Sequence, residues 1–233
     1  MKRSKRSQRP ARASQAKQTP QRQQDAAPQG LVRRARLHQS IRRPGFDFTF
    51  SMRRLVIDMT QRMPQLAHID MDHVAVAIVQ ARVNSTHGIY ASLTPMRFEK
   101  GAKFTIRRGR KYAVQALFDE HGREMRYILS FYLPRFMDLD CSEKMITIFH
   151  ELWHISPQFD GDIRRHPGRC YAHSSSQKEY DAQMAVLAKK YLKMRPPKEL
   201  YQFLENDFRE LYQRQGGVYG VMIQRPKLLP LPG

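Results

Sequence analysis

The residues best suited to chemistry form the run His-Glu-Leu-Trp-His at positions 150–154. On an α-helix, residues four positions apart share one face, so both imidazoles can approach a single metal ion. Zinc held in this way lowers the pKa of a bound water to about 7, and a neighbouring carboxylate can exchange protons with that water. The motif therefore predicts hydrolysis by metal-activated water, with His150 and His154 as zinc ligands and Glu151 as general base.

A helix that ends near Pro157 is expected to carry this motif. Asp140 followed by Glu143 is typical of a helix N-terminus, and neither glycine nor proline interrupts the chain before Pro157. The helix has an apolar face, formed by Met145, Ile148, Phe149, Leu152 and Ile155. The histidines lie roughly opposite that face. We expect the apolar face to pack on a core; the alternative is an ordinary helix with polar histidines.

A third zinc ligand is expected downstream of the motif, because a catalytic zinc usually takes three protein ligands and one water. His173 is the preferred candidate, since the serines at 174–176 that follow it suit the start of another helix. His166 is the alternative third ligand. Weaker candidates are Cys170, Glu179 and Asp181.

The run 149–166, with the run 168–173, resembles the phage and prokaryotic metallopeptidases of the zincin-like class. These are similar in style to compact SprT-like and minimal gluzincin domains, and the resemblance is densest over residues 145–181. It implies that His150 and His154 bind zinc and that Glu151 activates water. The chain departs from the metzincin spacing H-x-x-G-x-x-H and has no N-E-x-x-S-D helix of the thermolysin type, so the third ligand stays open.

The resemblance also implies an edge strand beside the motif helix, which aligns an extended peptide by backbone pairing. Residues 126–133 are the candidate, because they form the last expected strand before the helix. An internal position in the sheet is the equally weighted alternative. An oxyanion-stabilising donor is also expected, and Tyr171 and Arg164 lie near in sequence, although no feature selects either.

The elements that must position the motif predict an α+β domain. Apolar residues at a spacing of three to four predict a helix over 51–63 that ends near Pro64. Strands are expected at 74–83, 89–98, 112–118 and 125–133, the last two joined as a hairpin through Gly122. Two further helices are expected over about 176–215. With the resemblance, this predicts a zincin-like fold with a small, mostly antiparallel sheet, the motif helix and flanking helices.

Composition divides the 233 residues into three parts. Residues 1–43 contain 13 basic residues and a single acidic one, with almost no apolar side chains, so a disordered basic tail is expected. Residues 44–215 are expected to form the metallopeptidase domain. Residues 216–233, rich in proline near their end, are expected to form an extended tail.

The formal net charge of +20 favours contact with polyanions. Nucleic acid is therefore a candidate partner of the basic tail, and a solubilising tail without a partner is the equal alternative. A second basic run, residues 107–111, precedes an expected strand and can contact phosphates. A solvated basic turn is the commoner explanation of such a run.

Several protein classes are excluded by the sequence pattern. The longest clearly apolar run, residues 74–79, is too short to span a bilayer. The basic N-terminus is not followed by the apolar segment of a secretory signal. Cys141 and Cys170 are the two cysteines and form no C-x-x-C pair, so no disulfide framework is expected. We expect a cytoplasmic protein with no membrane partner.

Three functions are compatible with these patterns. The leading hypothesis is a zinc-dependent metallopeptidase that acts on a peptide or protein substrate. The second is a basic nucleic-acid-associated protein with a structural zinc, in which His166 and His173 would both ligate and close the site. The third is a zincin fold that has no turnover and is used for binding.

Overall fold

The computed structural model describes residues 32–34, 44–81, 88–165 and 177–232. Helices and short strands are mixed along this part of the chain, which confirms the predicted α+β class. The α-helices are α1 (Phe48–Arg62), α2 (Cys141–Trp153), α3 (Gln177–Lys193) and α4 (Phe208–Gln215). Short 3₁₀ helices occur at Pro64–Leu66, Met71–His73, Glu99–Gly101, Lys198–Leu200 and Gln202–Glu205.

Helix ends follow the capping residues. α1 begins earlier than predicted, because the side chain of Asp47 accepts a hydrogen bond from the Phe50 amide over 2.9 Å. The second predicted C-terminal helix is broken: α4 starts after Asp207, which forms a capping box with Glu210. None of the described helices combines the length and the apolar composition that crossing a lipid bilayer requires.

The central sheet has the order β3 (Val74–Gln80), β8 (Tyr127–Leu133), β4 (Ala91–Pro95). β8 lies in the middle, parallel to β3 and antiparallel to β4. Residues 126–133, the candidate edge strand, therefore form an internal strand of the sheet. This is the alternative that the sequence left open. The reason is burial: nearly every side chain of β8 is buried, as expected for a strand that is covered on both faces.

The hairpin expected around Gly122 is only partly present. Its turn closes, since the Met125 amide donates to the Leu117 carbonyl over 2.8 Å and Gly122 has a φ of 78°. β7 (Ala116–Phe118) is short, however, and β8 pairs with β3 and β4 instead. Turn residues carry a local sequence signal, whereas the choice of a strand partner that is distant in sequence does not.

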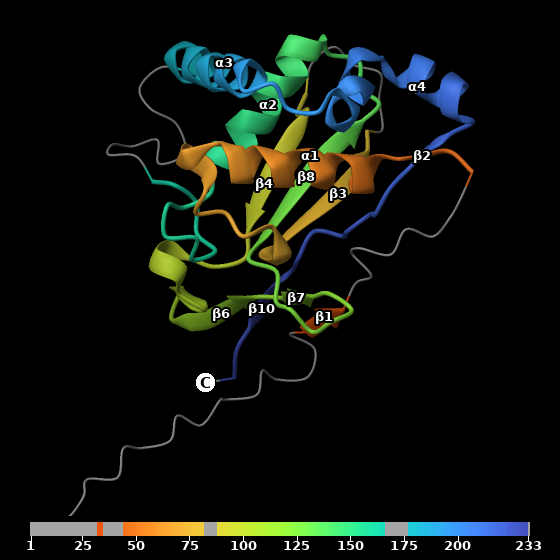
Figure 1. Cartoon of the computed structure of the whole chain (residues 1–233). Coiled ribbons are helices and arrows are strands. Elements are labelled where there is room, and N and C mark those ends of the chain that lie inside the picture. Colours follow the sequence, from red (N-terminus) through yellow and green to blue (C-terminus); the bar gives the residue numbers. More distant parts are fainter. Residues whose placement is uncertain (1–31, 35–43, 82–87, 166–176, 233) are drawn as a thin grey trace, which may run out of the picture.

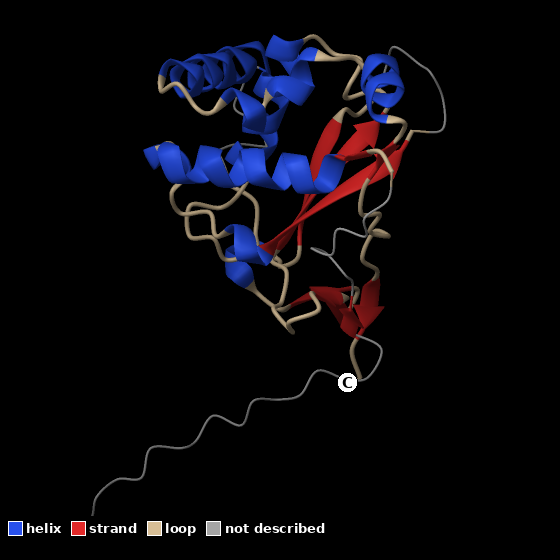
Figure 2. Cartoon of the chain, turned by 45° about the vertical axis from the view of Figure 1, so that its right-hand side comes forward, coloured by secondary structure: helices blue, strands red, loops and turns tan. Residues whose placement is uncertain are grey.

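Three small sheets complete the strand pairing. An antiparallel sheet has the order β10 (Leu228–Pro230), β6 (Arg110–Val114), β5 (Phe104–Arg107). Two parallel pairs join β1 (Val32–Arg34) to β7 and β2 (Phe46–Asp47) to β9 (Val218–Tyr219). The sheet of β5, β6 and β10 lies at the end of the molecule away from α3 and α4 (Figures 1 and 2).

The two faces of the central sheet pack against different partners. Val76, Leu129 and Phe131 join the apolar side chains of α1, α2 and α3 in the main core. On the other face, Ala77 and Ile128 pack with side chains of β7 and of the C-terminal segment. The helices α1 and α2 therefore share one face of the sheet (Figure 1), which brings α2 against β4.

The C-terminal segment, predicted as an extended tail, is hydrogen-bonded along the molecule. The Ile78 amide donates to the Val221 carbonyl, and the Gln115 amide donates to the Lys227 carbonyl, each over 2.8 Å. The strands β9 and β10 belong to this segment. Most of the predicted N-terminal tail lies outside the described residues, so the three-part division of the chain stays a prediction.

Candidate active site

The platform of the candidate site is α2, which the sequence predicted. Asp140 caps the helix by accepting a hydrogen bond from the Glu143 amide over 2.9 Å. The predicted apolar face, including Ile148 and Leu152, is buried in the main core. His154 occupies the C-cap position in a right-handed helical conformation. The helical spacing of the motif therefore extends to its last residue.

The structure brings the two motif histidines together on one side of α2. The ring centroids of His150 and His154 lie 4.8 Å apart, with 74° between the ring planes. Both rings contact Tyr180 of α3, whose centroid is 4.8 Å from that of His150 and 5.7 Å from that of His154. α3 thus fixes the imidazoles from the side, a contact for which the sequence gives no local signal.

Asp181 of α3 orients His150. Its Oδ1 lies 3.3 Å from Nδ1 of His150. With the Nδ1 proton donated to this carboxylate, the lone pair of the neutral ring is on Nε2, where a metal would bind. Asp181 is only a weak ligand candidate by sequence, and its contact with His150 depends on the packing of α3 against α2.

Glu151 is buried beside β4, with 9% of its surface exposed. Burial raises the pKa of its carboxyl to about 7, and the backbone amide of Leu93 opposes this shift. Among the described residues, no arginine or lysine forms an ion pair with Glu151. A buried carboxyl in this setting is stabilised as the carboxylate when a cation binds next to it.

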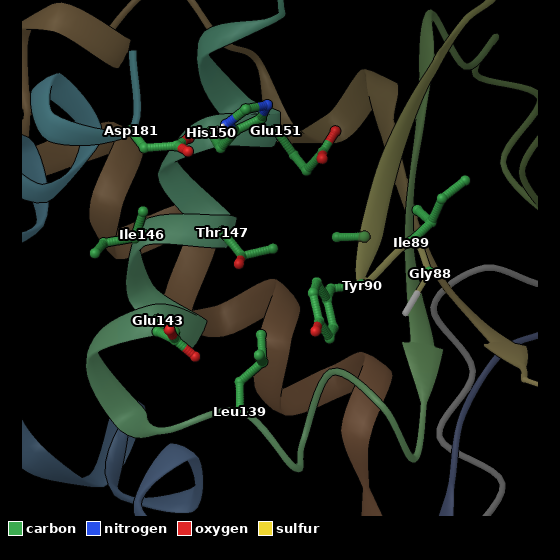
Figure 3. A pocket seen from close by; sticks show the side chains of 11 residues that line it. Gly88, Ile89, Tyr90, Leu139, Glu143, Ile146, Thr147, His150, Glu151 and Asp181 are labelled. Atoms are coloured by element: carbon green, nitrogen blue, oxygen red, sulfur yellow. Dashed lines mark hydrogen bonds and ion pairs between the residues drawn. The ribbon is translucent and has the colours of Figure 1, made fainter. Parts of the chain in front are cut away.

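His150, Glu151 and Asp181 line one cavity of about 600 Å³, whereas His154 is not among its described lining residues. His150, Glu151 and Asp181 lie at one end, and residues 88–91, just before and at the start of β4, form the opposite wall (Figure 3). The remaining described lining residues are Gly88, Ile89, Tyr90, Ala91, Leu139, Glu143, Ile146 and Thr147. The cavity is therefore a cleft between α2 and β4, wide enough for part of a peptide.

The free edge of β4 borders this cleft. The Tyr90 carbonyl accepts from the Tyr132 amide, and the Met96 amide donates to the Arg126 carbonyl. The backbone N–H and C=O groups of the even-numbered residues in this stretch therefore point toward β8. In an antiparallel pair the intervening residues point their N–H and C=O groups the other way. Ala91 and Leu93 thus present backbone groups off the sheet edge, on the side of Glu151. The sheet edge beside α2 therefore belongs to β4, and the prediction of residues 126–133 as this edge is wrong.

The loop after α2 folds back on the end of the helix. The Arg164 amide donates to the His154 carbonyl over 2.6 Å, and its guanidinium lies over the Trp153 ring at 4.2 Å. Burial lowers the pKa of Arg164, whose Nε donates to the Trp153 carbonyl. These contacts hold Arg164 on the helix end, and its role as an oxyanion donor stays a prediction. The other candidate donor, Tyr171, lies outside the described residues.

The donors present suit a divalent metal such as zinc. Two imidazoles share one helix face, one of them oriented by a carboxylate, and a buried carboxyl lies on the same helix. Within the part of the chain that the structure describes, no third histidine, cysteine or carboxylate completes a metal-binding group with them. His166, Cys170 and His173 lie outside the described residues, so the third ligand stays a prediction.

One comparison with known proteins identifies relatives. The profile of a family described as putative phage metallopeptidase matches residues 49–191. The matched segment contains nearly all of α1, the central sheet and α2, and most of α3, and it includes every described residue that lines the cleft. No curated protein and no solved structure matches the chain.

Proposed function

Because the chain belongs to the putative phage metallopeptidase family, we propose that it hydrolyses peptide bonds at a zinc ion held by His150 and His154. The observation that carries this proposal is the shared cleft: a histidine oriented by Asp181 and a buried Glu151 face it from one helix. A closed structural zinc is less well supported, because the cleft reaches Glu151.

Each residue has a separate task in the proposed reaction. When bound, zinc polarises the scissile carbonyl and lowers the pKa of water. Glu151 accepts the proton of the attacking water and donates it to the leaving amine nitrogen. The outward backbone groups of Ala91 and the carbonyl of Leu93 pair with the substrate, so its extended chain is held along β4, while the Leu93 amide bonds to Glu151. Asp181 keeps the His150 ring in the orientation and tautomer that zinc requires.

We propose His173 as the third zinc ligand, with His166 as the alternative. Both belong to the segment 166–176, and the described residues on either side of it contact the histidine pair. Arg164 is bonded to the His154 carbonyl, and Tyr180 packs on both imidazole rings. The contacts of these described residues support a ligand from the segment that joins them.

Two further proposals concern the surroundings of the enzyme. The basic residues of 1–43 suit contact with nucleic acid, since each neutralised phosphate releases counterions. A cytoplasmic location accords with the absence of a disulfide framework in the sequence.

We also propose the domain limits 44–215 for the peptidase, with the C-terminal residues 216–233 packed along it.

The substitution Glu151→Gln tests the proposed function. Glutamine keeps the size of the side chain but cannot accept a proton, so cleavage of labelled casein should fall by about 10²–10⁴-fold. The zinc content per chain should stay unchanged. Removal of zinc with a chelator should abolish cleavage by the wild type, and added zinc should restore it.

Glu143→Gln is the matched control, because Glu143 lies in the same cleft and on the same helix but away from the histidines. Its activity should stay within a few-fold of the wild type. Cleavage by the Glu151→Gln variant at the wild-type rate would refute the assignment of the general base.

A further inference from the structure

A strongly basic hairpin lies outside the catalytic cleft. It comprises β5, β6 and their turn, residues 103–111, and we call it the basic hairpin. Its cations are Lys103, Arg107, Arg108, Arg110 and Lys111. Among the described residues none of these five forms an ion pair, and all five side chains are exposed. The hairpin thus concentrates positive charge that the rest of the described structure does not neutralise.

The backbone conformation and the charges of the turn are both unfavourable for the residues that form it. Arg108 has a φ of 49° and Gly109 a φ of 75°, the combination of a two-residue turn that favours Asn-Gly or Gly-Gly. An arginine is strained in this conformation. Arg107 and Arg110 are paired directly across the strands, where like charges repel. A bound polyanion would offset that repulsion, which indicates a ligand for the tip.

The shape of the basic hairpin limits what it can bind. β10 pairs with β6 only at Tyr112–Val114, with one further bond to the Lys111 carbonyl, so the tip continues as a two-stranded ribbon. The exposed apolar side chains, Phe104 and Ile106, lie on the arm behind the arginine tip. A hairpin that enters a membrane would carry apolar side chains at its tip, so a lipid surface is the poorer fit.

We propose that the basic hairpin binds duplex DNA, with its ribbon in the major groove and its arginines on phosphates. The major groove of B-form DNA is about 12 Å wide and admits a two-stranded ribbon. The corresponding groove of A-form RNA is too narrow for side chains to read. Arginine is the cation best matched to phosphate, because its planar guanidinium can donate two parallel hydrogen bonds.

The N-terminal basic residues enter the described structure at the same end of the molecule. β1 pairs with β7, which follows β6 almost directly in the chain, and Figure 1 places these strands together. Residues 1–31, which precede β1, contain eight basic residues and one acidic residue. The basic hairpin and β1, the strand that this basic segment precedes, thus lie at one end of the described structure, away from α3.

The test compares two triple variants of the full-length protein that lose the same charge. The hairpin variant is Arg107→Gln, Arg108→Gly and Arg110→Gln. The control variant is Lys189→Gln, Lys190→Gln and Arg214→Gln, whose side chains are exposed on α3 and α4. Binding to a short fluorescein-labelled DNA duplex is measured by anisotropy over a range of salt concentrations.

We expect the hairpin variant to bind the duplex at least about tenfold more weakly than the wild type. Its slope of log affinity against log salt should be smaller by about 2–3, because about one phosphate contact is lost per arginine. The control variant should lose less than about threefold, since charges far from a phosphate act only at long range.

Three results would overturn the proposal: no duplex binding by the wild type, equal losses in both variants, or an equal loss for single-stranded DNA. A loss confined to anionic phosphatidylserine vesicles would assign the hairpin to membranes instead.

Thermal unfolding checks the fold, and glycine at position 108 suits the turn better than arginine. Should the triple variant melt lower than the wild type, Arg107→Gln alone provides the comparison. Casein cleavage should be unchanged in both triple variants.

Discussion

At the residue scale, the site depends on how one carboxylate and one imidazole are held. The 3.3 Å contact between Asp181 Oδ1 and His150 Nδ1 crosses from α3 to α2. A carboxylate in this position fixes the ring and raises the basicity of the metal-binding nitrogen. In the proposed mechanism Asp181 is therefore a positioning residue, whereas Glu151 acts on the reacting atoms.

The substitution Asp181→Asn tests this role. An amide keeps the shape but not the charge, so zinc affinity should fall by about 10–100-fold. Competition with a chelating dye measures this affinity, and the melting temperature of the metal-free protein should hardly change. Glu199→Gln, on the exposed surface, is the control and should leave zinc affinity unchanged. Unaltered zinc affinity in Asp181→Asn would show that the contact does not serve the metal.

Residue types and spacing alone predict a site at the motif histidines and Glu151, and the structure places the two histidine rings together. The i, i+4 spacing identifies a shared helix face without any knowledge of the fold. Asp181 is different, because its role depends on where α3 lies, and a carboxylate at that position has no distinctive pattern. The third ligand stays open for another reason: the sequence favours His173 but leaves His166 as an alternative, and both lie outside the described residues.

At the scale of elements, the central sheet explains how β4 comes to border the cleft. Sequence order favoured 126–133 as the edge strand, but β8 is apolar on both of its faces, which suits an internal strand. β4 contains Ser92, Thr94 and Pro95, residues that suit an edge. The composition of the two strands thus distinguishes the internal strand from the edge strand, whereas their order in the sequence does not.

The turn between β7 and β8 is held by Asp119. Burial would raise the pKa of its carboxyl, but hydrogen bonds from Arg123 and from the His121 amide outweigh burial and hold the pKa below its usual value. A group whose pKa is lowered on folding stabilises the protein above its ordinary pKa. That stabilisation is lost as the pH falls through the pKa of the folded state.

Asp119→Asn should therefore lower the free energy of unfolding by about 2 kcal/mol at pH 7, from the loss of charge-assisted hydrogen bonds. The difference from the wild type should shrink as the pH falls below about 4. Urea unfolding at pH 7, 4 and 3 measures it. Glu120→Gln, the neighbouring residue, is the control. A difference that grows on acidification would contradict the assigned direction of the pKa shift.

At the scale of the whole molecule, the C-terminal segment joins parts that are distant in sequence. The Val221 amide donates to Oγ1 of Thr49 in α1, and its carbonyl accepts from Ile78 in β3. Farther along, the Leu231 amide donates to the Lys111 carbonyl in β6. The proline content of the C-terminal segment predicted an extended backbone. It did not predict which strand edges this backbone covers.

Removal of residues 218–233 should lower stability substantially. Four hydrogen bonds outside the strand ladders are lost, together with the pairings of β9 and β10. At about 1 kcal/mol for each of the four, the melting temperature should fall by at least about 10 °C. Differential scanning calorimetry of the zinc-loaded protein measures this change. Removal of residues 232–233 alone is the control and should have no effect. An unchanged melting temperature after the longer truncation would mean that the segment does not stabilise the domain.

The central claim is that His150 and His154 hold one zinc ion beside Glu151. Crystals of the zinc-loaded, full-length protein, measured at the zinc absorption edge, test it most directly. We predict one strong anomalous peak about 2.1 Å from a ring nitrogen of each histidine, with the Glu151 carboxylate outside ligand distance. A peak elsewhere in the chain, with the two imidazoles turned to different surroundings, would contradict the account.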